Sequence, residues 1–576
     1  MPDVPLLVFG PRSTTYDFGP SHPLTPRRFG PGIDLLRAVG ASPGLAPEPA
    51  SDDELRACHT AAYLEVVRRF SEYAHESWGS EAGIGPGDDP AFHGMHEAAA
   101  AVAGGSIRAI EAILRGDVEH AYHPGGGLHH AMPARAAGFC IYNDPALAIA
   151  RARRDGLRVL YVDLDVHHGD GVQAIHASDP GVLTFSIHET GRYLFPGTGF
   201  ATEVGEGEAA GSIVNVPLDP ETGEAAWLAA VSSLVPELAA AFAPDIVVSQ
   251  HGADSHAWDP LADLNNTTTA MGAAARLVDA VAHRWAGGRW LSTGGGGYGV
   301  YRVVPRAWAL TWLAAAHREV PEAIPAEWRD RWATEAARYG DRSLPETFRD
   351  EPNAGLPTSA SQAAAEAESL EAAGLARLVA VPRLIREAVD RGWWSPLDPV
   401  PAEAGPTADA GGVPHLVAEV DREHLERLSI APRVVAGLAP AALKSLLLAA
   451  SSLDLTAAVA GDTIVGLVAS AHDDPTHAAH GRSILAIGVT PAARRQGLAT
   501  AMLHKHVQHF GQAGPMTASV TLAERDPVEP LDRGLRTSIA RRLLERAGFD
   551  VEPARSRLAQ ADPGALSAVR TGPSDR

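Results

Sequence analysis

The segment Asp163-Leu164-Asp165-Val166-His167-His168-Gly169-Asp170 decides how this 576-residue chain is interpreted. It follows the apolar run 159–162, which predicts a buried parallel β-strand. Alternate side chains of a strand share a face, so Asp163, Asp165 and His167 project together at its C-terminal end. Ligands bind at that end of the strands in open α/β sheets. Two carboxylates and an imidazole there predict a divalent metal site, against the alternative of solvated aspartates beside an unrelated histidine.

Four other segments carry histidine, aspartate, tyrosine and glycine in the same order as one known family. They are PGGGLHHA at 124–131, GFCIYND at 138–144, QHGAD at 250–254 and TGGGGYG at 293–299. Apolar strands are expected directly before the last two. Together with 163–170, these segments resemble the histone deacetylase superfamily, an arginase-like α/β fold whose parallel sheet is flanked by helices. The stretches 249–268 and 87–100 resemble its bacterial acetoin-utilisation branch most, and the resemblance covers about residues 5 to 320.

The resemblance implies that Asp165, His167 and Asp254 bind a catalytic zinc. A zinc with three protein ligands keeps an open position, polarises an amide carbonyl and acidifies water. Because two of the three ligands are carboxylates, Fe(II) stays open as the native metal beside Zn(II).

The resemblance also implies the residues that handle protons. His129 and His130 are the tandem pair, of which one acts as general base and the other as electrostatic partner or general acid. Asp163 would orient His129, and Asp170 would orient His130. Tyr298, in its glycine-rich loop, would donate a hydrogen bond to the oxygen on which charge develops.

Substrate contacts follow from the same resemblance. It implies that Phe139 and Phe195 wall an acyl-lysine channel, that His168 and Leu261 line it, and that Asp88 on the rim holds the substrate backbone. Each phenylalanine alone is equally typical of a hydrophobic core, and Asp88 with Asp89 is equally typical of a solvated acidic surface. Ser186 and Ile187 correspond to the family's structural potassium site.

Composition narrows the functional classes. The formal net charge of −22 leaves no basic stripe for nucleic acid. No apolar run is expected to span a membrane, and residues 1–5 lack the basic region of a signal peptide. With only two cysteines, Cys58 and Cys140, disulfides are not expected, and the cytoplasm is the simplest location.

The chain is predicted to contain two catalytic domains joined by a linker. We expect a deacetylase domain at 1–325, its helical extension at 326–395, a Pro/Ala/Gly linker at 396–412, a second domain at 413–555 and a flexible tail at 556–576.

The second domain shows a strand–loop–helix pattern. Two strands joined by a Gly-Asp turn are predicted over 456–468, a further strand over 484–489, and a helix over 500–510. The intervening R-x-x-G-x-A and the later LLERAGF at 543–549 resemble the GNAT acetyltransferase family. Backbone N–H groups at such a helix start capture the pyrophosphate of acetyl-CoA. The implied binding residues are Val489, Arg494, Arg495, Gln496, Gly497, Leu498 and Ala499.

One position departs from the GNAT pattern. Leu544 stands where many such enzymes carry a tyrosine, a general acid for the departing thiolate, and nothing in the sequence positions Glu524 or Asp526 as a base. We therefore expect a metal-dependent deacetylase of acetyl-lysine, with an acyl-CoA synthetase as the suggested protein substrate, fused to an acetyl-CoA-dependent acetyltransferase. The alternatives are a deacetylase of small acetylated amines, such as acetylpolyamines, and a non-catalytic GNAT domain that senses acetyl-CoA.

Overall fold

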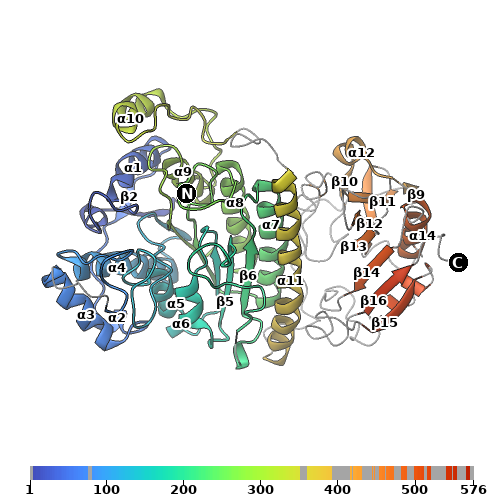
Figure 1. Cartoon of the computed structure of the whole chain (residues 1–576), viewed down its shortest axis with the longest axis horizontal. Coiled ribbons are helices and arrows are strands. Elements are labelled where there is room, and N and C mark those ends of the chain that lie inside the picture. The colour runs from blue at the N-terminus through green and yellow to red at the C-terminus, as the bar shows by residue number, and fades with distance from the viewer. Residues whose placement is uncertain are drawn as a thin grey trace. The chain divides into compact units, whose positions relative to one another are not determined.

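A computed structural model gives two compact units, Met1–Ala380 and Val381–Arg576, which are considered separately (Figure 1). The first is described at residues 4–74, 81–205, 207–350 and 360–380. The second is described at 381–391, 415–417, 419–430, 444, 447, 453–460, 462–472, 482–489, 498–510, 516–520, 540–541, 543–545, 547, 549–553 and 566–570.

The first unit is built on an eight-stranded sheet of order β2-β1-β3-β8-β7-β4-β5-β6, in which every neighbouring pair is parallel. Its strands are β1 Leu6–Val8, β2 Pro43–Leu45, β3 His120–His123, β4 Val159–Asp163, β5 Val182–Glu189, β6 Ile213–Leu218, β7 Ile246–Gln250 and β8 Trp290–Thr293. All residues of β3, β4, β5, β7 and β8 are buried, as expected for strands covered by helices on both faces.

Helices cover both faces of this sheet, and alternate strand residues supply the two cores. Val8 and Ala121 enter one hydrophobic cluster, and Leu7 and Tyr122 enter the other. The first face carries α3 Ala61–Glu72, α4 Met95–Arg115, α5 Asp144–Arg154 and α6 Asp170–His176, with the short α2 Asp52–Leu55 nearby. The second carries α1 Phe29–Ala38, α7 Glu224–Phe242, α8 Thr268–Trp285 and α9 Val304–Ala315.

Two further helices follow the sheet, α10 Ala326–Arg338 and α11 Ala360–Asp390. Arg377 of α11 binds Glu237 of α7 through two hydrogen bonds of 2.6 and 2.8 Å, and Ser369 contacts Thr222 at 2.7 Å. The first compact unit ends at Ala380, within α11, instead of at the expected residue 395.

One helix is an exception to the prediction that no segment is long and apolar enough to span a membrane. α7 has 19 residues and is long and apolar enough to cross a membrane, judged by length and composition alone. Its most apolar window is 61% buried, and the helix packs against β4, β5 and α8. Its hydrophobicity is therefore accounted for by the core of the first unit.

The second unit has a mixed sheet of order β15-β16-β14-β13-β12-β11-β9, with β10 joined to β12. Its strands are β9 His415–Val417, β10 Ser429–Ile430, β11 Leu453–Ala460, β12 Thr463–His472, β13 Arg482–Val489, β14 Met516–Val520, β15 Asp550–Pro553 and β16 Leu566–Arg570. Helix α14, Leu498–Phe510, packs on one face through Met502, Leu503 and Val507. The short α12, Arg422–Arg427, contributes Leu425 to the core of the other face.

The predicted hairpin, strand and helix of the second unit correspond to β11–β12, β13 and α14. The second sheet extends past the predicted domain end at residue 555. Residues 566–570 form β16, whose backbone pairs with both β14 and β15, so the sheet continues into the expected tail. The expected linker at 396–412 lies outside the described residues.

Candidate active site

Three acidic or imidazole side chains meet at the C-terminal edge of the first sheet. Asp165 and His167 follow β4, and Asp254 follows β7, the neighbouring strand. His167 Nδ1 lies 3.1 Å from Asp165 Oδ1 and 3.2 Å from Asp254 Oδ2. All three are buried, and their donor atoms lie within 4.8 Å of one another. The expected ligand set is thus brought together.

The two carboxylates are held by fixed donors. Gln250 Nε2 donates to Asp165 Oδ2 at 2.6 Å, and the Val166 N–H donates to Asp254 Oδ1 at 3.0 Å. A Cβ on Gly296 would overlap the Asp254 carboxylate, so only glycine lets this loop pass so close. Burial, followed by the charge of Asp165, raises the pKa of Asp254 to about 6. Two buried carboxylates around one imidazole fit a divalent cation, which would neutralise their charge.

The tandem histidines form a second buried group. His129 Nδ1 lies 2.8 Å from Asp163 Oδ2, and His130 Nδ1 lies 2.7 Å from Asp170 Oδ1. The two Nε2 atoms are 3.0 Å apart. Each imidazole therefore has the carboxylate partner expected for it, and the two rings face each other through their remaining nitrogens.

The surroundings shift the pKa values of the two histidines in opposite directions. Burial opposes charge on His129, but Asp163 and then Asp165 outweigh it and raise its pKa to about 9. Burial, with the neighbouring His129 charge, lowers the pKa of His130 to about 4. The same surroundings therefore favour the charged form of His129 and the neutral form of His130 near neutral pH.

Tyr298 is positioned by its own backbone. The N–H of Tyr298 donates to Asp259 Oδ2 at 2.7 Å, and the Gly299 N–H also reaches that oxygen, at 3.3 Å. Asp259 is buried, and burial together with Asp254 raises its pKa to about 8. The Tyr298 and Phe139 rings meet edge to face, with centroids 5.9 Å apart.

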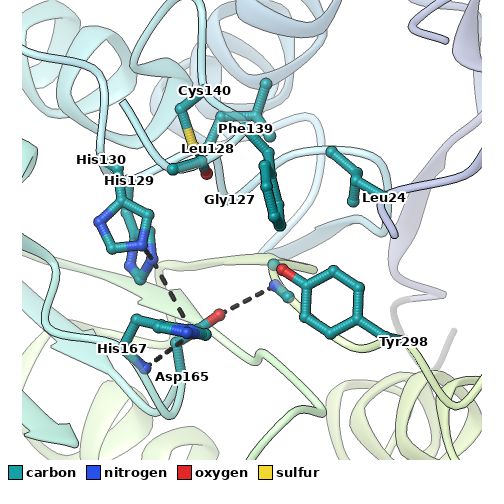
Figure 2. Close-up of a pocket in the computed structure, with 13 residues that line it drawn as sticks. Leu24, Gly127, Leu128, His129, His130, Phe139, Cys140, Asp165, His167 and Tyr298 are labelled. Carbon is teal, nitrogen blue, oxygen red and sulfur yellow. Dashed lines mark hydrogen bonds and ion pairs between the residues drawn. The ribbon is translucent and has the colours of Figure 1, made fainter. Parts of the chain in front are cut away.

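His129, His130, Asp165, His167 and Tyr298 line one cavity of about 280 Å³, a volume that includes space open to solvent. Figure 2 shows His129 and His130 on one side, Tyr298 across from them, Phe139 above, and Asp165 with His167 at the base. The lining residues are Leu24, Gly127, Leu128, His129, His130, Gly138, Phe139, Cys140, Asp165, His167, Gly295, Gly296 and Tyr298. Candidate ligands and proton carriers thus face the same small volume.

Of the remaining predicted substrate residues, one lies beside the cavity and the others do not line it. The Phe195 ring centroid lies 5.0 Å from that of His130, beside the cavity. His168 does not line it: its ring is buried and bonded to Thr198 and Gln173, each at 2.8 Å. Leu261 is half-buried outside the lining, and Asp88 is exposed. Asp89, the neighbour of Asp88, is buried, and burial followed by Asp88 raises its pKa to about 8.

Ser186 and Ile187 lie in β5, where Ser186 is directly beside Asp163 in the parallel pair. The Ser186 hydroxyl contacts His188 Nδ1 at 2.8 Å. Both positions are buried next to the strand that carries the ligand segment.

Several supporting residues were not predicted from the sequence. Tyr161 donates to Asp163 Oδ2 at 2.7 Å, and Asp144 accepts the Leu128 N–H at 2.8 Å, which holds the loop before the histidines. Buried Arg28 donates to the Gly295 carbonyl at 2.7 Å. Asp144, Gln250 and Asp259 stand within the segments that carried the resemblance, which was the available signal. Arg28 stands far outside them.

In the second unit, β13 ends at Val489 and α14 begins at Leu498, so the expected strand–loop–helix is present. Arg494, Arg495, Gln496 and Gly497 lie outside the described residues, as do Glu524 and Asp526. Ala499 is half-buried in the first turn of α14. β13 pairs in parallel with β14 only through its first three residues, Arg482 to Ile484. Leu544 is buried in the core beneath α14.

Comparisons with known proteins agree with this architecture. Residues 22–315 match the model of the histone deacetylase domain, and residues 434–527 match that of the acetyltransferase (GNAT) family. The acetoin utilization protein AcuC of Bacillus subtilis (strain 168) is 44% identical over 315 residues, which are 54% of this chain and 81% of the relative. The AcuC protein of Staphylococcus xylosus is 36% identical over 319 residues, 54% of this chain and 83% of the relative.

Solved structures give the same result for the fold. A crystal structure of an HDAC homolog complexed with SAHA has a TM-score of 0.55 and 28% identity, covering 64% of this chain and 99% of that one. An HDAC homolog from Aquifex aeolicus has a TM-score of 0.54 and 27% identity, covering 63% of this chain and 99% of that one. The chain belongs to the histone deacetylase family, in which it resembles the AcuC proteins, and it carries a C-terminal GNAT-family domain. The predicted fold class and family are confirmed.

Proposed function

We propose that the first unit is a metal-dependent hydrolase that removes acetyl groups from the side-chain amine of lysine. The observation that carries this proposal is that two oppositely tuned histidines share one cavity with Asp165 and His167, which cluster with Asp254. Amide hydrolysis needs a polarised carbonyl, an acceptor for the water proton and a donor to the leaving amine. Separate groups of this site can serve each need.

Zn(II), with Fe(II) as the alternative occupant, would be held by Asp165, His167 and Asp254, where it would supply a Lewis acid for the substrate carbonyl. His130, whose lowered pKa favours the neutral form, would accept the proton of the attacking water at Nε2 and then return it to the nitrogen of the leaving amine as the C–N bond breaks. His129 would keep its positive charge and stabilise the negative charge that develops. The Tyr298 hydroxyl would donate a hydrogen bond to the former carbonyl oxygen.

The cavity supports a linear acyl-amine substrate. The cavity is small, and aromatic Phe139 lines it with Phe195 nearby. A lysine side chain that carries an acetyl group is long, thin and largely apolar, so it suits this shape. We propose that exposed Asp88 contacts the backbone of the substrate at the rim, and that Ser186 and Ile187 help to hold a potassium ion beside Asp163.

The second unit would bind acetyl-CoA at the start of α14. The parallel pair β13 and β14, followed by a loop into a helix, supports this assignment, because helix N-termini bind pyrophosphate. We propose that it transfers acetyl groups to amines, so that the two units act in opposite directions in the cytoplasm, on substrates that include an acyl-CoA synthetase. Both cysteines of the chain are free and buried, as a reducing compartment requires.

A second candidate substrate rests on the exposed Asp88. A carboxylate at the rim would attract a cationic acetylpolyamine as well as a peptide. Competition between an acetyl-lysine peptide and acetylspermidine for the same enzyme separates the two. Stronger inhibition by acetylspermidine, together with its turnover, would favour the small amine.

The main test uses the full chain, stripped of metal and reloaded with Zn(II) or Fe(II). Acetate release from an acetyl-lysine peptide should require the metal and fall by about 10²–10³ in Tyr298→Phe, which loses one donor to the oxyanion. His504→Ala, an exposed position in α14, is the matched control. If the reloaded enzyme released no acetate from the peptide or from acetylspermidine, the proposed hydrolase would be wrong.

A further inference from the structure

A second cluster of metal-binding side chains lies at the opposite edge of the first sheet. His120 begins β3, Asp279 and His283 lie one turn apart near the C-terminus of α8, and His317 follows α9. One donor atom from each of the four lies within 4.8 Å of the others. The catalytic residues follow the C-terminal ends of the strands, whereas His120 stands at an N-terminal end, so the two clusters are separate.

The separations match those of a tetrahedral ion. Asp279 Oδ1 lies 3.1 Å from His317 Nε2 and 3.5 Å from the Nε2 atoms of both His283 and His120. The Nε2 atoms of His283 and His317 are 3.1 Å apart. A tetrahedral zinc with bonds of about 2.0–2.1 Å separates its ligand atoms by roughly 3.3 Å. Three imidazole nitrogens and a carboxylate oxygen also form a ligand set typical of zinc.

His120 is the member that an ordinary surface cluster does not explain. Its side chain is 1% exposed. Nδ1 contacts the Ala315 carbonyl at 2.7 Å and must donate to it, so Nε2 carries the lone pair. Among the described residues this buried Nε2 has no hydrogen-bond partner, although it points at Asp279. A buried acceptor without a donor is costly, and a bound cation would satisfy it.

His317 is held in place by an unusual backbone. It has φ +51°, in the left-handed region, and directly follows the end of α9. Its N–H donates to the Ala314 carbonyl, and the Arg318 N–H donates to Leu313, the pattern that closes a helix through a left-handed residue. Glycine or asparagine is usual there, so a histidine at this position carries a conformational cost. The conformation places its imidazole against His283 and Asp279.

We propose that His120, Asp279, His283 and His317 form a second, four-coordinate zinc site. Four protein ligands complete a tetrahedral shell and leave no position for substrate, which is the arrangement of a structural site. The ion would join the start of β3, the end of α8 and the turn after α9. Because the side chains of His283 and His317 are 39% and 48% exposed, the ion could enter from solvent.

The test counts zinc in the untagged full chain after equilibration with a zinc buffer. His167→Ala/Asp254→Asn removes the candidate catalytic site and should retain one zinc per chain. Adding His317→Ala to that variant should remove it and weaken zinc binding about 100-fold or more in chelator competition. Adding His504→Ala instead should change nothing. Since His317 is exposed, its replacement should not prevent folding.

Two further readouts distinguish an ordered site from loose binding. Co(II) bound to His167→Ala/Asp254→Asn should show the visible absorption of a tetrahedral ion, lost with His317→Ala. Zinc should raise the thermal midpoint of that variant and leave the midpoint of the His317→Ala form unchanged. His317→Ala alone should retain deacetylation. A His167→Ala/Asp254→Asn protein that keeps no zinc, or whose zinc survives His317→Ala, would overturn the proposal.

Discussion

The two units differ in how their candidate sites are supported. In the first, His129, His130 and Asp165 each have a buried partner that sets their orientation or charge. In the second, the position where many GNAT enzymes carry a tyrosine holds Leu544, which is packed in the core. The first unit therefore allows a role to be proposed for each residue. The second allows a ligand to be proposed from its fold, while its chemistry has no such residue-level support among the described positions.

This contrast has a physical cause. A hydrolase active site needs several charged groups buried together, and burial of charge is costly unless each group is paired. The required partners leave a dense network that can be recognised. Binding of a pyrophosphate needs mainly backbone N–H groups at a helix start, which any sequence with the right turn can provide. A GNAT fold is thus compatible with catalysis or with sensing alone.

The largest expected effect tests the histidine pair. His130→Ala should lower kcat/KM for deacetylation by about 10³-fold, because the neutral proton acceptor is lost. Acetyl-CoA binding, measured by calorimetry on the same protein, should not change. Comparable losses in both measurements would mean that the variant perturbs the whole chain, which circular dichroism and thermal unfolding would reveal.

Replacing the buried Leu544 should destabilise the second unit. Leu544→Ala should lower the free energy of unfolding of that unit by about 2–5 kcal/mol, because it leaves a cavity under α14. Denaturant titration followed by hydrogen exchange in β12 and α14 measures this loss. Deacetylation should be retained. An unchanged stability with abolished acetyl transfer would instead assign Leu544 a direct part in the reaction.

A third prediction concerns pH. Asp163 and Asp165 keep the pKa of His129 at about 9, so its charge is present below that pH and is lost as the pH rises through it. Asp163→Asn should therefore move the alkaline limb of the kcat/KM profile to lower pH, and reduce the maximum by about 10–100-fold. The acid limb, attributed to protonation of His130 near pH 4, should stay in place. An unmoved alkaline limb would contradict the role of charged His129.

The smallest effect tests the ligand of the second unit. Arg494→Ala should weaken acetyl-CoA binding about tenfold, since one cation near the pyrophosphate is removed. In a Tyr298→Phe background, any acetyl transfer to a lysine peptide can be measured without the opposing hydrolysis. Transfer that disappears with Arg494→Ala would make the second unit an enzyme, whereas binding without transfer would leave it a sensor.

Much of the first unit could be predicted from its sequence. Asp163, Asp165 and His167 alternate after an apolar run, and period-two spacing places them on one face whatever the rest of the chain does. The parallel strands, the ligand trio and the tandem histidines with their carboxylates were predicted and are brought together in the structure. Spacing along the strand was sufficient only for Asp163, Asp165 and His167. The ligand role of Asp254 and the carboxylate partners of the two histidines were implied by the resemblance to the histone deacetylase family.

Other features depended on contacts between distant residues. Arg28 reaches Gly295 from 267 positions away, and His168, though adjacent to a ligand, turns out of the cavity toward Thr198. The pairing of β16, which extends the second sheet beyond residue 555, likewise depends on partner strands. The cluster of His120, Asp279, His283 and His317 spans almost 200 residues without a recognisable motif. Only the packing of α9 against both β3 and α8 brings these side chains together, since spacing along the chain carries no information about such encounters.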